Sequence, residues 1–215
     1  MLSGWRFLTT IVMGIRTIVF DFGNVLGFFS HRRAAEQLAV YADGLDADAI
    51  QSLLLDEQLE DDYERGVLSS TSFRALVRER CRLTCDDGQF DTAYADMFSP
   101  NAETCELIPA LKSRHRLLLL SNTTELHSRW FLKQFAAVLA HFDGVVLSHE
   151  VGVRKPHRRV YDHCLALADC SASECLFIDD LHANIEAARA CGWQGHLYRP
   201  GGDLVRQLAA LGVSL

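Results

Sequence analysis

"IRTIVFDFGNVLGFF", residues 15–29, begins with an apolar run that ends on a single carboxylate, Asp21. A run made up mainly of branched and aromatic side chains predicts a strand over 15–20 that is buried on both faces. Gly23 and Asn24 then predict a turn directly after the strand. An acidic residue at this point suits the mouth of an active site, but it also suits an ordinary polar strand end. The rest of the chain is needed to decide.

Similar apolar runs recur along the chain, and the later ones are separated by segments with apolar residues at helical spacing. The further predicted strands are 116–120, 143–148, 174–178 and 195–198. Strands that alternate with helices of this length predict a parallel sheet with helices on both faces. The expected fold class is α/β, with a Rossmann-like, three-layer parallel sheet core.

The interval between the first two strands contains helical patterns and no convincing strand. It is about 70 residues long, whereas a parallel crossover needs only about a dozen. We therefore expect an inserted, all-helical cap domain over 28–100, with hinges at Gly27 and Ser99–Pro100. The core domain would comprise 15–27 and 101–215, and 1–14 would be an N-terminal extension.

Composition narrows the choice of partners. The formal net charge of −7 disfavours nonspecific nucleic-acid binding, and no apolar stretch approaches the length of a membrane span.

Seven irregularly spaced cysteines indicate reduced thiols and a cytoplasmic protein. Cys81 and Cys85 could hold a metal, but ordinary packing is the expectation, because no second Cys/His pair has suitable spacing. No long heptad run is present, so we expect a monomer or weak homodimer.

Polar residues follow the predicted strands where open parallel sheets bind ligands, at the carboxyl ends. They are Asp21, Ser121, Asn122, Thr123, Asp179 and Asp180, with Lys155 in a nearby loop. Helix capping explains each one singly. Together they predict phosphoryl transfer to a carboxylate, with Mg²⁺ held by the acidic residues and Lys155 offsetting negative charge.

Four segments resemble the ordered motifs of the haloacid dehalogenase-like (HAD) hydrolase superfamily. They are "VFDFGNVL", "LLLLSNTTELH", "GVRKPHRRVYDHCL" and "FIDDLHANIEAARACG". "YERGVLSSTSF", residues 63–73, resembles the small helical cap of its first subfamily. Within that subfamily the pattern is most similar to bacterial alpha-glucose-1-phosphate phosphatase-like members. The resemblance extends over residues 15–200.

The resemblance implies a Mg²⁺-dependent phosphatase that acts on a small phosphorylated metabolite, with a sugar phosphate favoured, through an aspartyl-phosphate on Asp21. Asp21 would be both nucleophile and metal ligand. The further metal ligands would be the carbonyl of Gly23, Asp180 directly, and Asp179 directly or through water. The phosphoryl group would be bound by Ser121, Asn122 and Lys155, with Lys155 also catalytic. Asn184 would orient the acidic pair.

Gly23 departs from the pattern, because many members of the superfamily carry there an aspartate that protonates the leaving alcohol. Help of this kind is typically worth about 10²–10⁴-fold in rate. Its absence favours less basic leaving groups, such as the anomeric hydroxyl of a sugar 1-phosphate. His31 could replace the missing acid if the cap closes, although a solvent-exposed histidine on a cap helix is the simpler interpretation.

Two alternatives remain open. The lack of an acid at Gly23 is compatible with a catalytically weak phosphate-binding or regulatory protein. The dehalogenase branch of the superfamily also uses an aspartate nucleophile, but it needs no metal. The pair Asp179–Asp180 argues for a metal and against that second alternative.

Overall fold

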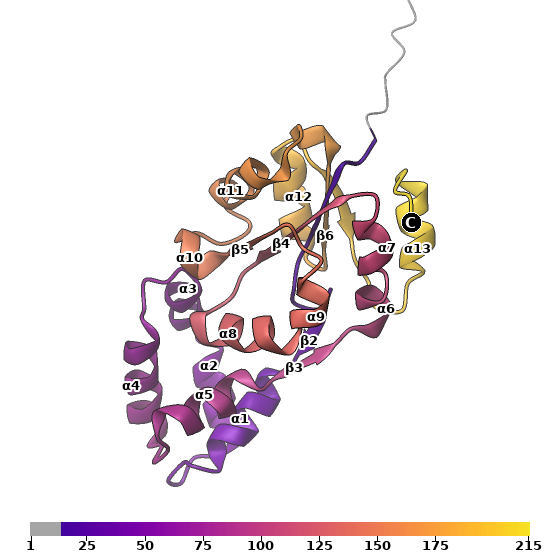
Figure 1. Ribbon diagram of the computed structural model, residues 1–215. Coiled ribbons are helices and arrows are strands. Elements are labelled where there is room, and N and C mark those ends of the chain that lie inside the picture. The colour runs from indigo at the N-terminus through magenta and orange to yellow at the C-terminus, as the bar shows by residue number, and fades with distance from the viewer. Residues whose placement is uncertain (1–13) are drawn as a thin grey trace, which may run out of the picture.

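The computed structural model describes residues 14–215, and its centre is a five-stranded parallel sheet (Figure 1). The strand order is β5-β4-β1-β6-β7. The strands are β1 (Thr17–Phe20), β4 (Arg116–Ser121), β5 (Gly144–Leu147), β6 (Cys175–Asp179) and β7 (Gln194–Leu197). All five predicted strands are present, and β1 lies in the middle of the sheet between β4 and β6.

Alternate residues of the central strands enter two different hydrophobic clusters. Ile18 and Phe20 of β1 belong to one cluster, whereas Val19 belongs to the other. In β4, Leu117 and Leu118 divide in the same way. Because side chains alternate across a strand, an apolar run without polar interruptions requires apolar cover on both faces of the sheet.

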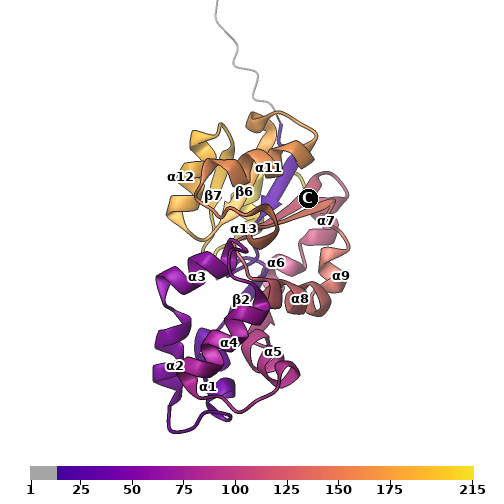
Figure 2. The same ribbon diagram turned by 90° about the vertical axis from the view of Figure 1, so that its left-hand side faces the viewer.

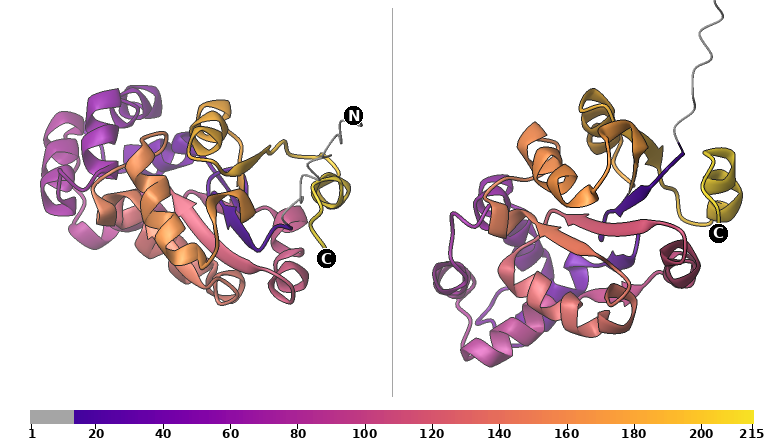
Figure 3. Two further views of the ribbon diagram at one scale, coloured as in Figure 1. Left: turned by 90° about the horizontal axis from the view of Figure 1, so that it is seen from above. Right: turned by 45° about the horizontal axis from the view of Figure 1, so that its top comes forward.

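Helices supply that cover, as the views in Figure 3 show. One face packs against α11 (Arg158–Ala168) and α12 (His182–Ala190), which contribute Tyr161, Cys164 and Ile185 to the cluster around Val19. The other helices of the core are α6 (Ala102–Cys105), α7 (Ile108–Lys112), α8 (Glu125–Gln134), α9 (Ala136–Leu139), α10 (Ser148–Val151) and α13 (Leu204–Ala210), with a short 3₁₀ helix at Ala172–Glu174. The predicted three-layer α/β fold is confirmed.

A separate group of helices lies beyond the carboxyl ends of the strands (Figure 2). They are α1 (His31–Ala39), α2 (Ala47–Leu54), α3 (Glu57–Glu64), α4 (Ser70–Cys81) and α5 (Asp87–Ala95). Each begins at a side chain that caps a backbone N–H; the caps are Ser30, Asp46, Asp56, Ser69 and Asp86. We call residues 31–95 the helical lobe.

The helical lobe is joined to the core by a two-stranded antiparallel ribbon of β2 (Gly27–Phe29) and β3 (Phe98–Pro100). The sequence of residues 30–100 predicts no strand, so β3 is a departure from that expectation. Strands of three residues are too short to show an alternating pattern, and the pairing partner lies far away along the chain. The ribbon coincides with the predicted hinges at Gly27 and Ser99–Pro100.

Within the described residues, no helix is long and apolar enough to cross a membrane. All seven cysteines are free thiols, and Cys81 and Cys85 are both buried, as ordinary packing predicts. The predicted N-terminal extension, apart from Gly14, lies outside the described residues.

Candidate active site

The residues that follow β1, β4 and β6 meet at one edge of the sheet. Phe20, at the end of β1, is level with Leu119 of β4 and Ile178 of β6. Asp21 therefore emerges between Leu120 and Asp179. Since the carboxyl ends of parallel strands lie at the same edge, the chain folds three distant polar segments into one place.

Lys155 connects these segments from a loop after α10. Its Nζ lies 2.7 Å from Asp21 Oδ1 and 2.8 Å from Asp179 Oδ2, and it donates to the Leu120 carbonyl at 3.0 Å. The side chain of Lys155 is only 1% exposed. Burial by itself would lower the pKa of Lys155, but the two carboxylates outweigh it and raise that pKa above its usual value. Lys155 is therefore a fixed positive charge at the end of β1.

Asp21 is buried beside this charge and accepts a further hydrogen bond from the Phe22 N–H at 2.7 Å. Burial raises the pKa of the Asp21 carboxyl to about 7. Lys155 opposes this effect, while repulsion from Asp179 and Asp180 adds to it. Lys155 therefore does not fully offset the combined effect of burial and of the two neighbouring carboxylates on the pKa of Asp21.

Different amides hold the two carboxylates after β6. Asn184 donates to both oxygens of Asp179, each at 3.0 Å, and the Leu181 N–H donates to Oδ1 at 2.8 Å. Asp180 instead accepts from Asn24 Nδ2 at 2.9 Å. Asn184 was expected to orient the pair, but its hydrogen bonds to the pair go to Asp179. Asn24, a residue that the sequence analysis assigned only to the turn, holds Asp180.

Asp21, Asp179 and Asp180 together form a possible metal-binding group, with one carboxylate oxygen of each lying within 4.8 Å of the others. Three carboxylates face the single ammonium of Lys155 in this cluster. The excess negative charge and the all-oxygen donor set suit a hard divalent cation. Within the described part of the chain, this is the one such group of acidic, histidine or cysteine side chains.

The side-chain amide of Asn122 is hydrogen-bonded to the backbone of the loop that carries Lys155. Its Oδ1 accepts from the Lys155 N–H at 2.8 Å, and its Nδ2 donates to the Lys155 carbonyl at 3.0 Å. The prediction that Asn122 contacts a phosphoryl group therefore depends on its backbone N–H. The neighbouring Ser121 hydroxyl makes only a weak contact of 3.3 Å to the Asn122 carbonyl. Ser121 thus has the more available side chain at the end of β4.

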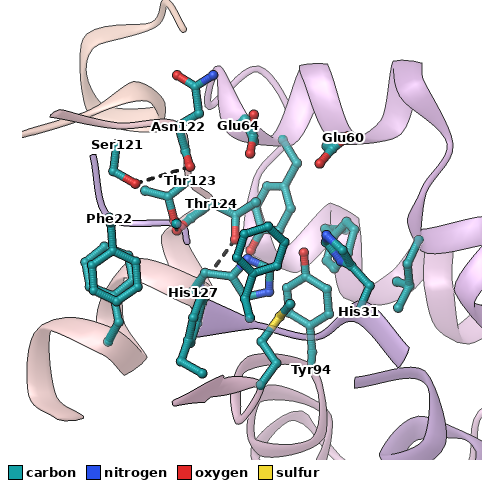
Figure 4. Close-up of a pocket in the computed structure, with 18 of the residues that line it drawn as sticks. Phe22, His31, Glu60, Glu64, Tyr94, Ser121, Asn122, Thr123, Thr124 and His127 are labelled. Carbon is teal, nitrogen blue, oxygen red and sulfur yellow. Dashed lines mark hydrogen bonds between the residues drawn. The ribbon is translucent and has the colours of Figure 1, made fainter. Parts of the chain in front are cut away.

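A cavity of about 90 Å³ lies between this edge and the helical lobe (Figure 4). Its walls are mainly aromatic and include Phe22, Phe29, Tyr63, Phe73, Tyr94, Phe98 and Phe131. The polar residues of its lining are Ser121, Asn122, Thr123, Thr124, His31, His127, Glu60 and Glu64. The sequence analysis noted His31 but did not single out Glu60, Glu64 or His127. Their signal is weak, because in the sequence Glu60 and Glu64 look like part of an acidic, solvated helix face.

Gly23 also lines the cavity, beneath the ring of Phe29. A Cβ atom at position 23 would lie 3.0 Å from Phe29 Cε1. The place where many relatives carry an acid is therefore next to an aromatic ring in this chain.

The helical lobe contacts the core through a loop and through the Arg154 side chain. Gly66 has a φ of +67°, and a Cβ there would lie 2.3 Å from the His149 carbonyl oxygen. Arg154 of the core faces two acidic residues of α3. Its Nε lies 3.1 Å from Glu64 Oε2, and its Nη1 lies 3.6 Å from Asp61 Oδ1. These contacts hold α3 and the loop after it, and with them Glu64 of the cavity lining, against the core.

The sequence matches the family described as haloacid dehalogenase-like hydrolase over residues 15–192. The chain belongs to this family. The predicted membership of the HAD hydrolase superfamily is thereby confirmed, and so is the prediction that the protein is a hydrolase. The assignment to the alpha-glucose-1-phosphate phosphatase-like branch stays a prediction.

Similar members of the HAD family include two curated phosphatases and a solved structure. D-ribitol-5-phosphate phosphatase of Bacteroides thetaiotaomicron is 26% identical over 204 residues, covering 92% of this chain and 98% of that protein. Phosphatase MT3486 of Mycobacterium tuberculosis is 29% identical over 223 residues, covering 94% and 98%. A HAD family enzyme of Bacteroides thetaiotaomicron, solved with magnesium and inorganic phosphate, has a TM-score of 0.76 at 23% identity, covering 90% and 99%. At that identity the structural likeness shows the fold alone.

Proposed function

We propose that the protein is a Mg²⁺-dependent phosphatase that transfers the phosphoryl group of a small phosphorylated metabolite to Asp21. The observation that carries this proposal is the position of Asp21. It lies buried at the end of the central strand, 2.7 Å from Lys155 and grouped with Asp179 and Asp180. The two phosphatase relatives, which align over more than nine-tenths of the chain, support the same reaction.

The residues at the sheet edge fit a magnesium ion. We assign Asp21, Asp180 and the carbonyl of Gly23 as direct ligands. Asp179 already accepts hydrogen bonds from Lys155, Asn184 and the Leu181 N–H. We therefore assign it a contact with Mg²⁺ through a water molecule. When bound, Mg²⁺ would neutralise negative charge on the carboxylates and on the phosphoryl oxygens.

Residues of the chain itself carry out the steps of the proposed phosphoryl transfer. An oxygen of Asp21 attacks phosphorus, the bond to the leaving oxygen breaks, and an aspartyl-phosphate forms. Lys155 favours the ionised form of Asp21 and offsets the charge of the incoming phosphoryl group. The Ser121 hydroxyl and the Asn122 N–H donate to phosphoryl oxygens. Attack by water on phosphorus then releases inorganic phosphate and restores the Asp21 carboxylate.

We propose a sugar or polyol phosphate as the substrate class. The D-ribitol-5-phosphate phosphatase relative supports it, and so do the polar groups among the aromatic walls of the cavity. A cavity of about 90 Å³ is far smaller than the roughly 300–1,000 Å³ of typical ligand pockets, so the leaving group is small or the helical lobe opens to admit it. We propose that this lobe acts as the cap domain, while a cytoplasmic location and a monomeric or weakly dimeric state stay predictions.

A phosphatase screen tests the proposed function. The purified protein is assayed with Mg²⁺ against sugar, polyol, nucleotide and flavin phosphates, and Asp21→Asn serves as the control. We expect turnover that is abolished by a chelator, restored by Mg²⁺ and absent in Asp21→Asn. Equal activity in the wild type and in Asp21→Asn would refute the mechanism.

The same screen separates the two alternatives. Phosphate binding without turnover would identify the weak, regulatory protein that the absence of an acid at Gly23 allows. Dehalogenation that persists with a chelator would identify the metal-independent enzyme. The charge of the Asp21, Asp179 and Asp180 group argues against that second outcome.

A further inference from the structure

Glu64 is the last residue of α3 and extends from the helical lobe over the sheet edge. Its side chain is only 12% exposed, and it lines the same cavity as Gly23 and Asn122. In Figure 4, Glu64 lies toward the Asn122 end of the cavity, whereas His31 lies farther away. A carboxyl group from the lobe therefore reaches the part of the cavity that is nearest to the strand ends.

No group in the described part of the chain donates a hydrogen bond to this carboxyl, and its Oε2 is a buried oxygen without such a partner. Arg154 Nε lies 3.1 Å from Oε2, but it is not aligned for a hydrogen bond. A buried carboxylate that lacks donors is costly to ionise, whereas the neutral acid keeps a proton that it can give away.

Burial and the charged groups around Glu64 together also favour its protonated form. Burial raises the pKa of the Glu64 carboxyl to about 7. Arg154 and Lys155 oppose this rise from the core loop, and Glu60 and Asp61 add to it from α3 itself. General acids work best when their pKa lies close to the working pH.

Other titratable groups in the cavity are poorly suited to proton donation near neutral pH. Burial lowers the pKa of His31, and it lowers the pKa of His127 to about 3, so both imidazoles are mainly neutral. Burial raises the pKa of Tyr63 to about 12 and that of Tyr94 further, which makes both phenols weak acids. Glu64 is therefore a better donor than His31, the replacement that the sequence suggested.

We propose that Glu64 protonates the leaving oxygen, the role for which Gly23 has no carboxyl group. The inference rests on the proposed phosphatase function. As Asp21 attacks, the electron pair of the breaking P–O bond moves to the leaving oxygen, and the Glu64 proton converts that oxygen into an alcohol. The Glu64 carboxylate then takes a proton from the water that attacks the aspartyl-phosphate, and the starting state returns.

This role changes the expected substrate range. Without a proton donor, Gly23 restricts the enzyme to less basic leaving groups, such as anomeric hydroxyls. With Glu64 as donor, alkyl phosphates, including open-chain polyol phosphates, are turned over at rates comparable with those of anomeric phosphates.

The test compares two leaving groups in the full-length protein with Mg²⁺. p-Nitrophenyl phosphate releases a stable phenolate and needs little acid help, whereas ribitol 5-phosphate must release a basic alkoxide. We expect Glu64→Gln to lower kcat/KM for ribitol 5-phosphate by about 100-fold or more, and for p-nitrophenyl phosphate by less than about threefold. Retained p-nitrophenyl phosphatase activity also shows that the variant is folded.

Two further variants separate chemistry from lobe closure. Glu57→Gln changes an exposed carboxyl on the same helix, α3, outside the cavity lining, and should affect neither substrate. Arg154→Gln breaks the contact between lobe and core and should lower kcat/KM for both substrates. An equal loss of Glu64→Gln on both substrates, or no loss on ribitol 5-phosphate, overturns the assignment. A wild type inactive on both substrates instead overturns the proposed function.

A direct measurement needs neither substrate nor metal. In protein with ¹³C-labelled glutamate carboxyls, we expect a resonance that titrates near pH 7 and is missing from the Glu64→Gln spectrum. Titration of that resonance in the ordinary glutamate range would overturn the assignment even if the kinetics agreed.

Discussion

Asn122 holds the backbone of Lys155 at two points, accepting from its N–H at 2.8 Å and donating to its carbonyl at 3.0 Å. This pair of hydrogen bonds joins the end of β4 to the loop after α10. It places the Lys155 ammonium beside Asp21, so Asn122 is a positioning residue for the proposed nucleophile.

Asn122→Asp replaces the donating Nδ2 with an oxygen that faces the Lys155 carbonyl. We expect Lys155 to shift and kcat to fall by about 10–100-fold, since small misplacements of catalytic groups have effects of this size. Steady-state kinetics on p-nitrophenyl phosphate measure the change. Asn101→Asp, which alters a buried amide hydrogen-bonded to Val25 and Tyr198, should lower stability but spare kcat. An unchanged kcat in Asn122→Asp would contradict the positioning role.

Lys155→Met keeps the length of the side chain but removes the only cation between Asp21 and Asp179. Breaking a buried ion pair from one side typically costs about 3–5 kcal/mol, because the remaining charge has no partner. We expect a loss of that size in the free energy of unfolding by urea, measured with a chelator present. Adding Asp179→Asn should recover part of the stability without restoring activity. A single variant as stable as the wild type would be inconsistent with this account.

Gly66→Ala tests the contact that closes the helical lobe. Alanine in the left-handed conformation costs about 1 kcal/mol wherever it occurs, but at position 66 its Cβ would also collide with the His149 carbonyl. We expect kcat/KM to fall by about tenfold or more as the lobe lifts. Gly44→Ala is the matched control, because Gly44 has a φ of +78° and no atom within 4 Å of the added Cβ. Equal kinetics in the two variants would show that the contact is dispensable.

His127 makes the stability of the protein depend on pH. Burial lowers its pKa from 6.5 to about 3, so unfolding takes up a proton between these values. The resulting stability is present above pH 6.5 and is lost as the pH falls towards 3, by up to about 1.4 kcal/mol per unit. From pH 6.5 to pH 5, we expect the wild type to lose about 2 kcal/mol more than His127→Phe.

Urea unfolding at both pH values measures this difference. Phenylalanine retains the stacking that His127 makes with Tyr94, where the ring centroids lie 4.2 Å apart. His163→Phe, at an exposed position, should follow the wild type. Parallel pH dependence in the wild type and in His127→Phe would rule out this contribution.

The sheet and the position of its acidic edge could be predicted from the sequence because both depend on local patterns. The three central strands are apolar runs, and Asp21 and Asp179 lie directly at the ends of two of them, so the parallel topology alone brings Asp21 close to Asp179. The proposed roles of Gly23, Ser121 and Asn184 stay predictions.

Other features depend on contacts between distant segments that no local pattern marks. Asn24 forms part of the turn signal after β1, and only the fold shows that it meets Asp180. Glu64 belongs to an acidic helix, and its isolation from donors depends on how α3 packs above the core. The pairing of Phe29 with Phe98 joins residues almost 70 positions apart, which strands of three residues cannot reveal in advance.

That pairing also makes the helical lobe a replaceable module. Because Phe29 and Phe98 are direct neighbours in an antiparallel ladder, a two-residue turn such as Asn-Gly could join them in place of everything between. The central sheet would keep its strand order and its connections. Evolution or design can therefore exchange the helical lobe, the proposed cap, while the residues of the proposed phosphoryl-transfer site remain where they are.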